Sequence, residues 1–261
     1  MGPVAAARER GEHVGVATVV GGAGTVGERA VYRPEAGFDG SGFLDGDARA
    51  TLGDHLDRVV AAGEGTTVAV ETDGGTVEVF VEGVRAPPEL VVFGSGHDVA
   101  PVVELAKQVD FRVTVVTFRG ARADAERYPR ADAVVSAAPR DVAGLREWDE
   151  DTYAVVMTHN FVDDRLTLEA LVETPVPYIG VMGPQKRFDE MHEDLQEEGV
   201  SLTATQRERL YTPIGLSLGG DTPYQIAMSI VSELLAVAND LTPEHLSRRG
   251  EPIHDRVELD G

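Results

Sequence analysis

Short runs of alternating apolar and polar residues fill the first third of the chain. Residues 13–20 (HVGVATVV) and 27–34 (GERAVYRP) carry β-branched and aromatic residues between turn signals, as strands do. Residues 66–82 form two further alternating runs on either side of an Asp-Gly-Gly turn at 73–75, which accommodates the positive φ of a hairpin. Between them, residues 47–63 repeat apolar positions at helical spacing and end in Gly63, a predicted C-terminal cap.

The pattern changes after Pro87 and Pro88, which remove two backbone donors and stiffen the chain. Beyond them, helical patterns alternate with nearly continuous apolar runs at 90–94, 113–118, 131–137, 153–159 and 176–183. Strands that are apolar on both faces, with helices between them, indicate a parallel sheet covered on both sides. We therefore predict an α/β protein, with a small β-rich α+β domain at 1–86 and a Rossmann-like domain at 87–261.

The last long helix has a strong start signal. Thr222, Pro223 and Gln225 take the N-cap, N1 and N3 positions of a capping box, and residues 226–238 are apolar nearly all round. We expect this helix to be buried, and we assign four methionines to the core: Met157, Met182, Met191 and Met228. Residues 242–261 form a polar tail to which we assign no structure.

The charge balance narrows the classes of partner. With 45 acidic and 23 basic residues, the formal net charge of −22 repels nucleic acids and anionic membranes, so neither is an expected partner. Only Lys107 and Lys186 are lysines, and the acidic residues are scattered along the chain. This pattern is typical of a surface adapted to high salt and predicts a halophilic archaeon as the source.

Cysteine is absent, which excludes disulfides, thiolate nucleophiles and cysteine-based metal sites, and we predict no metal site of other composition. The N-terminal residues lack the apolar core of a signal peptide, and no window approaches 18 uninterrupted apolar residues. We expect a soluble, cytoplasmic protein.

The stretch LVVFGSGHDVAPVVELA at 90–106 carries the main candidate site. A strand that ends in Gly94 and a helix that starts near Asp98 would direct free backbone N–H groups and a positive helix end at the crevice above the sheet. Gly94 permits the tight turn, and Gly96 would let a pyrophosphate approach the backbone. The dinucleotide fingerprint is incomplete, because Val99 stands where its third glycine would be.

The residue at the end of the second predicted strand is not the one that NAD binding usually requires. The acidic residue that binds a ribose in such folds is replaced there by Thr117, whose hydroxyl cannot accept two ribose hydrogen bonds. Arg119 follows and could meet a phosphate instead. The alternative is that Gly94 and Gly96 only make a tight turn between strand and helix.

Polar residues also follow the later strands, and in a doubly wound sheet these ends meet at one crevice. Thr158 and His159 end one strand, and Gly183, Lys186 and Arg187 follow the next. His97 and His159 could face each other across a ligand, or each could be an ordinary hydrogen-bonding group. Lys186 and Arg187 either neutralise a ligand phosphate or form a solvated first helical turn. We expect the glycine-rich loop before Thr222 to be a simple connection between sheet and helix, and not a second site where backbone N–H groups bind an anion.

Four motifs in order resemble the XdhC/CoxI family, the accessory factors of xanthine and carbon monoxide dehydrogenases. The resemblance spans about residues 14–240 and is closest after Glu89; the motifs are VVFGSGHDVAPVVELAKQVDFRVTVVTFR, VVMTHN, YIGVMGPQKR and PIGLSLGGDTPYQIAMSIVSELLAV. It implies a small N-terminal domain followed by a Rossmann-like domain.

The resemblance also implies a function. Such a protein binds molybdenum cofactor, a pterin that carries phosphate or pyrophosphate, assists its sulfuration and inserts it into a molybdenum hydroxylase. It acts as a cofactor-binding chaperone with no catalytic residue of its own. By position, the family's glycine-rich loop, its arginine and its threonine-histidine pair correspond to Gly94, Ser95, Gly96, His97, Arg119, Thr158 and His159, and Gly183 joins the expected set. A cysteine desulfurase and a second copy of the chain are further candidate partners.

The chain departs from the family pattern at three positions. Phe43 stands where members often carry a cysteine, and Thr117 and Ser217 stand where aspartate is frequent. A role that needs a thiol therefore cannot be performed by this chain. Two alternatives remain open: an NAD(P)-dependent oxidoreductase that uses the same loop, and a scaffold protein with a vestigial nucleotide site.

Overall fold

The structure is a computed structural model that describes residues 3–39, 46–120 and 123–248. It divides into two compact units, Met1–Pro87 and Pro88–Gly261. The loop around Phe43 and the end of the polar tail lie outside the described residues.

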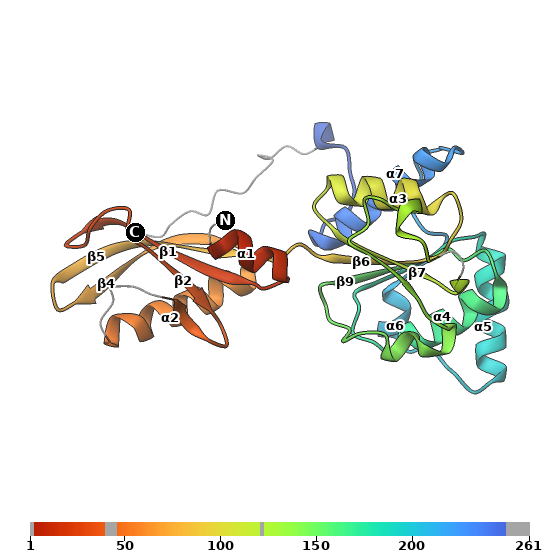
Figure 1. Ribbon diagram of the computed structural model, residues 1–261, viewed down its shortest axis with the longest axis horizontal. Coiled ribbons are helices and arrows are strands. Elements are labelled where there is room, and N and C mark those ends of the chain that lie inside the picture. Colours follow the sequence, from red (N-terminus) through yellow and green to blue (C-terminus); the bar gives the residue numbers. More distant parts are fainter. Residues whose placement is uncertain (1–2, 40–45, 121–122, 249–261) are drawn as a thin grey trace. The chain divides into compact units, whose positions relative to one another are not determined.

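Unit 1 is an antiparallel sheet with a helix on one face (Figure 1). Its elements are α1 (Pro3–Arg10), β1 (Val14–Gly22), β2 (Arg29–Arg33), β3 (Gly37–Asp39), α2 (Gly46–Ala62), β4 (Gly65–Thr72) and β5 (Gly75–Val84), and the strand order is β3-β2-β1-β5-β4. The helix at 47–63 and the 66–82 hairpin are confirmed, with Gly63 and Gly75 at positive φ. The pattern did not predict α1 or β3.

Two glycines let α2 lie close to the sheet. Gly15 and Gly83 are register partners on β1 and β5. A Cβ on Gly83 would lie 2.0 Å from the Val59 carbonyl oxygen, and one on Gly15 would lie 2.7 Å from Leu56. The helix therefore packs its buried face, which includes Leu52, directly onto the strand backbone.

Unit 2 contains a parallel sheet of β6 (Glu89–Phe93), β7 (Arg112–Thr117), β8 (Ala133–Ser136), β9 (Thr152–Val156), β10 (Tyr178–Val181) and β11 (Leu210–Tyr211). The strand order β11-β10-β9-β6-β7-β8 is the doubly wound order of a Rossmann fold, as predicted. All strands are parallel, but successive strands are added on one side of β6 up to β8 and on the other side from β9 to β11.

Helices cover both faces of this sheet (Figure 1). They are α3 (Val99–Gln108), α4 (Phe161–Val172), α5 (Gln185–Glu197), α6 (Ala204–Glu208) and α7 (Pro223–Ala238), with 3-10 turns η2 (Ala125–Arg127), η3 (Pro139–Gly144) and η4 (Leu246–Arg248). Leu90 and Val92 pack against α3 and α7, while Val91 and Phe93 pack against α4 and α5. Strand side chains alternate between faces, so a strand buried on both sides is apolar throughout.

The prediction for α7 is half correct. The capping box of Thr222 and Gln225 is present, with Pro223 at N1. Complete burial is wrong, however, because Met228 is 48% exposed and Tyr224 is 54% exposed. The helix lies on the outer layer of the unit, so only one of its sides meets the sheet and α3. Met157 and Met191 are core residues, as predicted, whereas Met182 is half-buried.

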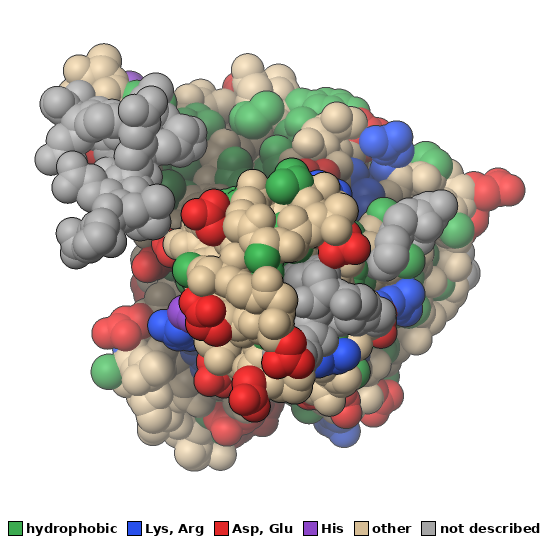
Figure 2. All heavy atoms as spheres, turned by 90° about the vertical axis from the view of Figure 1, so that its left-hand side faces the viewer, with side chains coloured by type: hydrophobic (Ala, Val, Ile, Leu, Met, Phe, Trp, Pro, Cys, Tyr) green, Lys and Arg blue, Asp and Glu red, His purple; other side chains and the backbone are tan. Residues whose placement is uncertain are grey.

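Acidic side chains are spread over the face shown in Figure 2 and do not form one patch. In the described part of the chain, no helix has the length and apolarity needed to cross a bilayer.

Candidate functional site

The candidate site lies at the carboxyl ends of β6 and β9, where the strand order reverses. In open α/β sheets this switch point opens a crevice, because the two following loops lead to helices on opposite faces. Here the loop after β6 leads to α3, and the loop after β9 leads to α4. The two loops carry most of the polar residues that the sequence singled out.

Gly94 is needed where β6 ends. Its N–H donates to the Val116 carbonyl at 3.0 Å, and a Cβ on it would lie 2.7 Å from the Met157 carbonyl oxygen. Only glycine therefore allows the first loop to pass so close to the end of β9. In the part of the chain that the structure describes, no protein group accepts a hydrogen bond from the N–H of Gly96 or His97. These amides are available to an acceptor from outside.

Asp98 precedes α3 but does not cap it through its side chain. The N3 position is Pro101, which has no N–H to donate, so one of the two usual capping bonds cannot form. The carboxylate is turned to the other loop instead, where Asp98 Oδ2 lies 2.7 Å from His159 Nε2. Asp98 therefore links the two loops of the crevice.

The turn after β9 is fixed by side-chain hydrogen bonds. The Asn160 N–H donates to Thr158 Oγ1 at 3.1 Å, and Asn160 Oδ1 accepts from the Asp163 N–H at 3.0 Å, which caps α4. His159, between them, has a φ of 59°, in the left-handed region that non-glycine residues rarely occupy. The turn thus holds the His159 side chain, 57% exposed, at the edge of the crevice.

Asp164 is the buried anchor of this turn. Its side chain is 1% exposed, and Oδ1 accepts from the Thr158 N–H at 3.1 Å and from the Thr158 hydroxyl at 2.5 Å. Its other oxygen accepts from Arg187 Nη2 at 2.7 Å, which ties α5 to α4. Gly183, with a φ of 127°, lets Arg187 pass, since a Cβ there would lie 2.8 Å from Arg187 Cδ.

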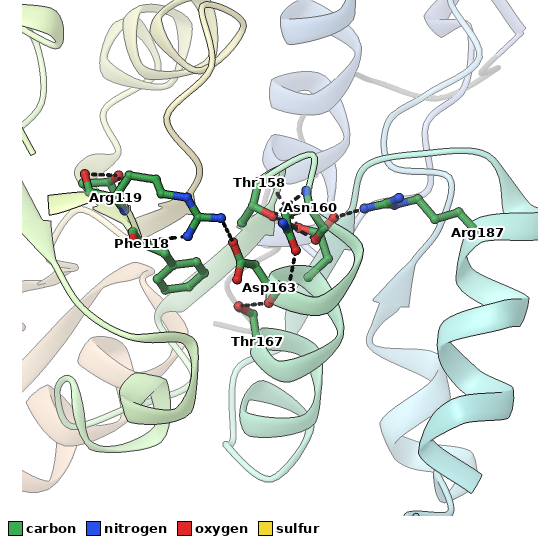
Figure 3. Close-up of polar contacts among 9 residues, drawn as sticks. Phe118, Arg119, Thr158, Asn160, Asp163, Thr167 and Arg187 are labelled. Atoms are coloured by element: carbon green, nitrogen blue, oxygen red, sulfur yellow. Dashed lines mark hydrogen bonds and ion pairs between the residues drawn. The ribbon is translucent and has the colours of Figure 1, made fainter. Parts of the chain in front are cut away.

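On the other side of the turn, Arg119 Nη2 donates to Asp163 Oδ2 at 2.9 Å. Figure 3 shows Arg119 and Arg187 reaching the turn after β9 from opposite sides. A small hollow of about 60 Å³ lies beside the first of these pairs, lined by Gly94, Ser95, Phe118, Arg119, Thr158 and Asp163. It is large enough for one compact polar group, and its charged lining groups are the Arg119 guanidinium and the Asp163 carboxylate.

Thr117 does not face a ligand. The residue is fully buried at the end of β7, and its Oγ1 accepts a hydrogen bond from the Arg119 N–H at 3.2 Å. It shapes the turn that carries Arg119, so this strand end offers no carboxylate to a ribose.

Comparison with known proteins supplies the family. A family model described as the XdhC Rossmann domain matches residues 90–234. The chain belongs to the XdhC family. The matched region covers both loops of the crevice, the helices α3, α4 and α5, and α7 as far as Leu234.

Two curated relatives share part of the chain. A probable xanthine dehydrogenase subunit of Bacillus subtilis (strain 168) is 28% identical over 160 residues, which are 61% of this chain and 46% of that protein. The uncharacterized protein YqeB of Escherichia coli (strain K12) is 28% identical over 177 residues, 66% of this chain and 31% of that protein. The chain thus matches less than half the length of either relative.

One solved structure shares the fold over nearly the whole chain. The crystal structure of a xanthine dehydrogenase from Bacillus halodurans has a TM-score of 0.54 at 19% identity, and the match covers 95% of this chain and 96% of that one. This likeness includes the β-rich unit before the XdhC domain.

The predicted site residues divide into three groups. Gly94, Ser95, Arg119 and Thr158 line the hollow. Gly96 and His159 adjoin Asp98, because a Cβ on Gly96 would lie 2.2 Å from Asp98 Oδ1. Gly96 thus leaves room for this carboxylate, and its role in a close approach of pyrophosphate stays a prediction.

His97 and Gly183 stand apart from the hollow. His97 is exposed and makes no side-chain contact with His159 among the described residues, and their placement on either side of a ligand stays a prediction. Gly183 serves the Arg187 side chain. Lys186 is 87% exposed and lies 3.6 Å from Glu190, as in a solvated first helical turn.

The sequence interpretation missed three aspartates, namely Asp98, Asp163 and Asp164. One signal was present for Asp98, because a proline at N3 weakens the case for a capping role. Asp163 and Asp164 form part of the first turn of α4, where acidic residues are common for helix-dipole reasons alone. Nothing local separates that role from ion pairing across the crevice.

The loop before α7 is a simple connection, as favoured. The Gly215 N–H donates to Glu233 at 2.9 Å, and the Leu216 N–H donates to the Ser229 carbonyl. The Tyr178 hydroxyl also donates to Glu233, at 2.7 Å, and burial followed by this carboxylate raises the pKa of Tyr178 well above its usual value. The amides of Gly215 and Leu216 are therefore committed to α7.

A larger cavity of about 620 Å³ lies along η3 and α4, away from the strand ends. Within its lining, Arg165 pairs with Glu198 at 2.6 Å and with Glu169 at 3.8 Å. Among the described residues, no three His, Asp or Glu side chains gather as a metal site.

Proposed function

We propose that this protein is a maturation factor that binds molybdenum cofactor, as phosphorylated molybdopterin or its dinucleotide, at the crevice between β6 and β9. It would assist sulfuration of the cofactor and its insertion into a xanthine dehydrogenase-type molybdenum hydroxylase. Membership in the XdhC family and a relative named as part of a probable xanthine dehydrogenase support this role. The observation that carries it is the hollow between the Gly94 loop and Arg119.

The hollow suits a phosphate group. Arg119 is cationic, and the amides of Gly96 and His97, which have no acceptor among the described residues, belong to the loop of Gly94 that lines the hollow. Arg119 is 53% exposed, and an ion pair in contact with water contributes little stability. A phosphate, with more charge than Asp163, can therefore draw the guanidinium away from that carboxylate.

The chain itself would hold the cofactor and carry out no sulfur chemistry. It has no cysteine, so sulfur must come from a partner such as a cysteine desulfurase. Release requires that docking on the hydroxylase weaken the contacts at the crevice, because a carrier that binds its cargo equally in both states transfers nothing.

Titration of the purified protein with molybdopterin, NADH and NADPH tests the proposal. We expect molybdopterin to bind, and Arg119→Ala to weaken binding about tenfold, the order of one charge-assisted hydrogen bond. Lys186→Ala removes the same charge from a solvated position and should leave affinity unchanged. A nicotinamide nucleotide that binds more tightly than molybdopterin would favour the oxidoreductase alternative.

Transfer is tested separately. Cofactor-loaded protein is mixed with a cofactor-free molybdenum hydroxylase, and the activity gained is compared with that from free cofactor at equal concentration. Equal gain from both would contradict a role in insertion.

A further inference from the structure

Asp98 and His159 form a carboxylate–imidazole pair across the crevice. Asp98 Oδ2 and His159 Nε2 are 2.7 Å apart, although the residues are 61 positions apart in the chain. The Asp98 side chain is 17% exposed and the His159 side chain is 57% exposed. The carboxylate is thus held inside the loop, while the ring faces the solvent side.

The demands of folding do not explain this pair. Asp98 leaves α3 without a side-chain cap, and its Oδ1 is buried without a hydrogen-bond partner among the described residues. His159 takes a left-handed conformation that costs a non-glycine residue about 1 kcal/mol. Gly96 is required to leave space for the carboxylate. The missing cap, the unpartnered Oδ1 and the left-handed His159 each cost stability, and all three are consequences of holding the His159 ring against Asp98.

The pair fixes the tautomer of the ring. An ionised carboxylate only accepts hydrogen bonds, so the proton of the neutral imidazole must lie on Nε2. Nδ1 then carries the lone pair, and it has no protein partner in the described part of the chain. The crevice therefore presents an oriented acceptor at His159 and a cationic donor at Arg119.

We propose that His159 Nδ1 accepts a hydrogen bond from a ring N–H of the bound pterin, and that Asp98 is the positioning residue that holds the proton of the neutral ring on Nε2. The inference rests on the proposed function and divides the ligand between two subsites. The phosphate lies at Arg119 and the hollow, and the nitrogen heterocycle lies at His159. A ligand without ring N–H donors would gain nothing from the second subsite.

The positioning role is tested without ligand. Side-chain ¹⁵N NMR of the labelled protein should show His159 Nε2 protonated and Nδ1 with a lone pair. In Asp98→Asn the amide can donate to Nε2, which should shift the proton to Nδ1. An unchanged tautomer in this variant would overturn the role of Asp98. The other histidines serve as internal references.

The binding role is tested with molybdopterin and its dephosphorylated form. We expect His159→Gln to weaken binding of both forms about tenfold, the order of one hydrogen bond. Arg119→Ala should weaken binding of the phosphorylated form only. His245→Gln, an exposed histidine beyond α7, is the matched control and should bind as wild type does.

A double-mutant cycle shows whether Asp98 acts through His159. Asp98→Asn combined with His159→Gln should bind no more weakly than His159→Gln alone.

His159→Gly relieves the left-handed backbone, so it should remain folded while losing the same affinity. Retention of wild-type affinity in His159→Gln and His159→Gly would overturn the second subsite, with the Arg119 subsite intact. If wild type binds neither form of the cofactor, the proposed function itself fails, and the tautomer result stands apart from it.

Discussion

At the scale of single residues, two neighbouring aspartates of α4 have different tasks. Asp163 faces the hollow and pairs with Arg119, whose side chain is 53% exposed. Asp164 is buried and receives hydrogen bonds from Thr158 and Arg187. The first pair can exchange partners with a ligand, whereas the second holds the turn that carries His159.

Replacing the buried anchor should therefore destabilise unit 2. We expect Asp164→Asn to lower the free energy of unfolding by about 2–3 kcal/mol, because Arg187 loses its charged partner inside the protein. Urea unfolding followed by fluorescence of Trp148, the single tryptophan of the chain, measures this change. Glu190→Gln, on the exposed side of α5, should change stability by less than about 0.5 kcal/mol. Equal effects of both variants would contradict the anchoring role.

At the scale of elements, α2 and the unit 1 sheet approach closely at a glycine pair. A Cβ on Gly83 would meet the Val59 backbone, which cannot move without displacing the helix. The close approach is set by the absence of a side chain at Gly15 on β1 and at Gly83 on β5, and not by the helix propensity of α2.

Gly83→Ala should destabilise unit 1 by about 3 kcal/mol or more through overpacking. Gly53→Ala is the matched control, because its Cβ would lie 3.7 Å from Tyr32, an ordinary contact, in mid-helix. This control should stabilise α2 by about 0.5–1 kcal/mol. Hydrogen exchange of β1 and β5 amides reports both changes, and protection unaltered in Gly83→Ala would contradict the packing argument.

The capping box of α7 gives a second test at this scale. Thr222→Ala removes the acceptor for the Gln225 N–H and should reduce the stability of unit 2 by about 1 kcal/mol. Thr242→Ala alters a threonine beyond the helix and should have no measurable effect. Trp148 fluorescence in urea again provides the readout.

At the scale of the whole molecule, the net charge of −22 dominates. Like charges spread over a surface repel, and salt screens them. The Debye length falls from about 30 Å at 0.01 M to about 3 Å at 1 M salt, so most of the screening gain comes early.

The melting temperature should consequently rise with KCl, steeply at first and then more slowly. Calorimetry from about 0.05 to about 2 M KCl measures it, with a variant in which ten exposed acidic residues become Asn or Gln as the control. That variant should depend less on salt. A melting temperature that does not change with KCl concentration would contradict adaptation to high salt. The halophilic source stays a prediction.

The sequence by itself determined the fold and most of its elements, although not α1 or β3. Alternation and helical spacing are local signals, and they predicted the hairpin of unit 1, the parallel sheet, the capping box of α7 and the loop at the switch point. It also determined the absence of thiol chemistry, because composition needs no coordinates.

Only the tertiary structure decided which side chains meet in the crevice. Asp98 and His159 are 61 residues apart, Arg119 and Asp163 are 44 apart, and Asp164 and Arg187 are 23 apart. No local periodicity encodes such pairs, because each depends on where separate strands end in the sheet. The exposed side of α7 was equally hidden, since a helix that is apolar all round does not specify how many neighbours will cover it.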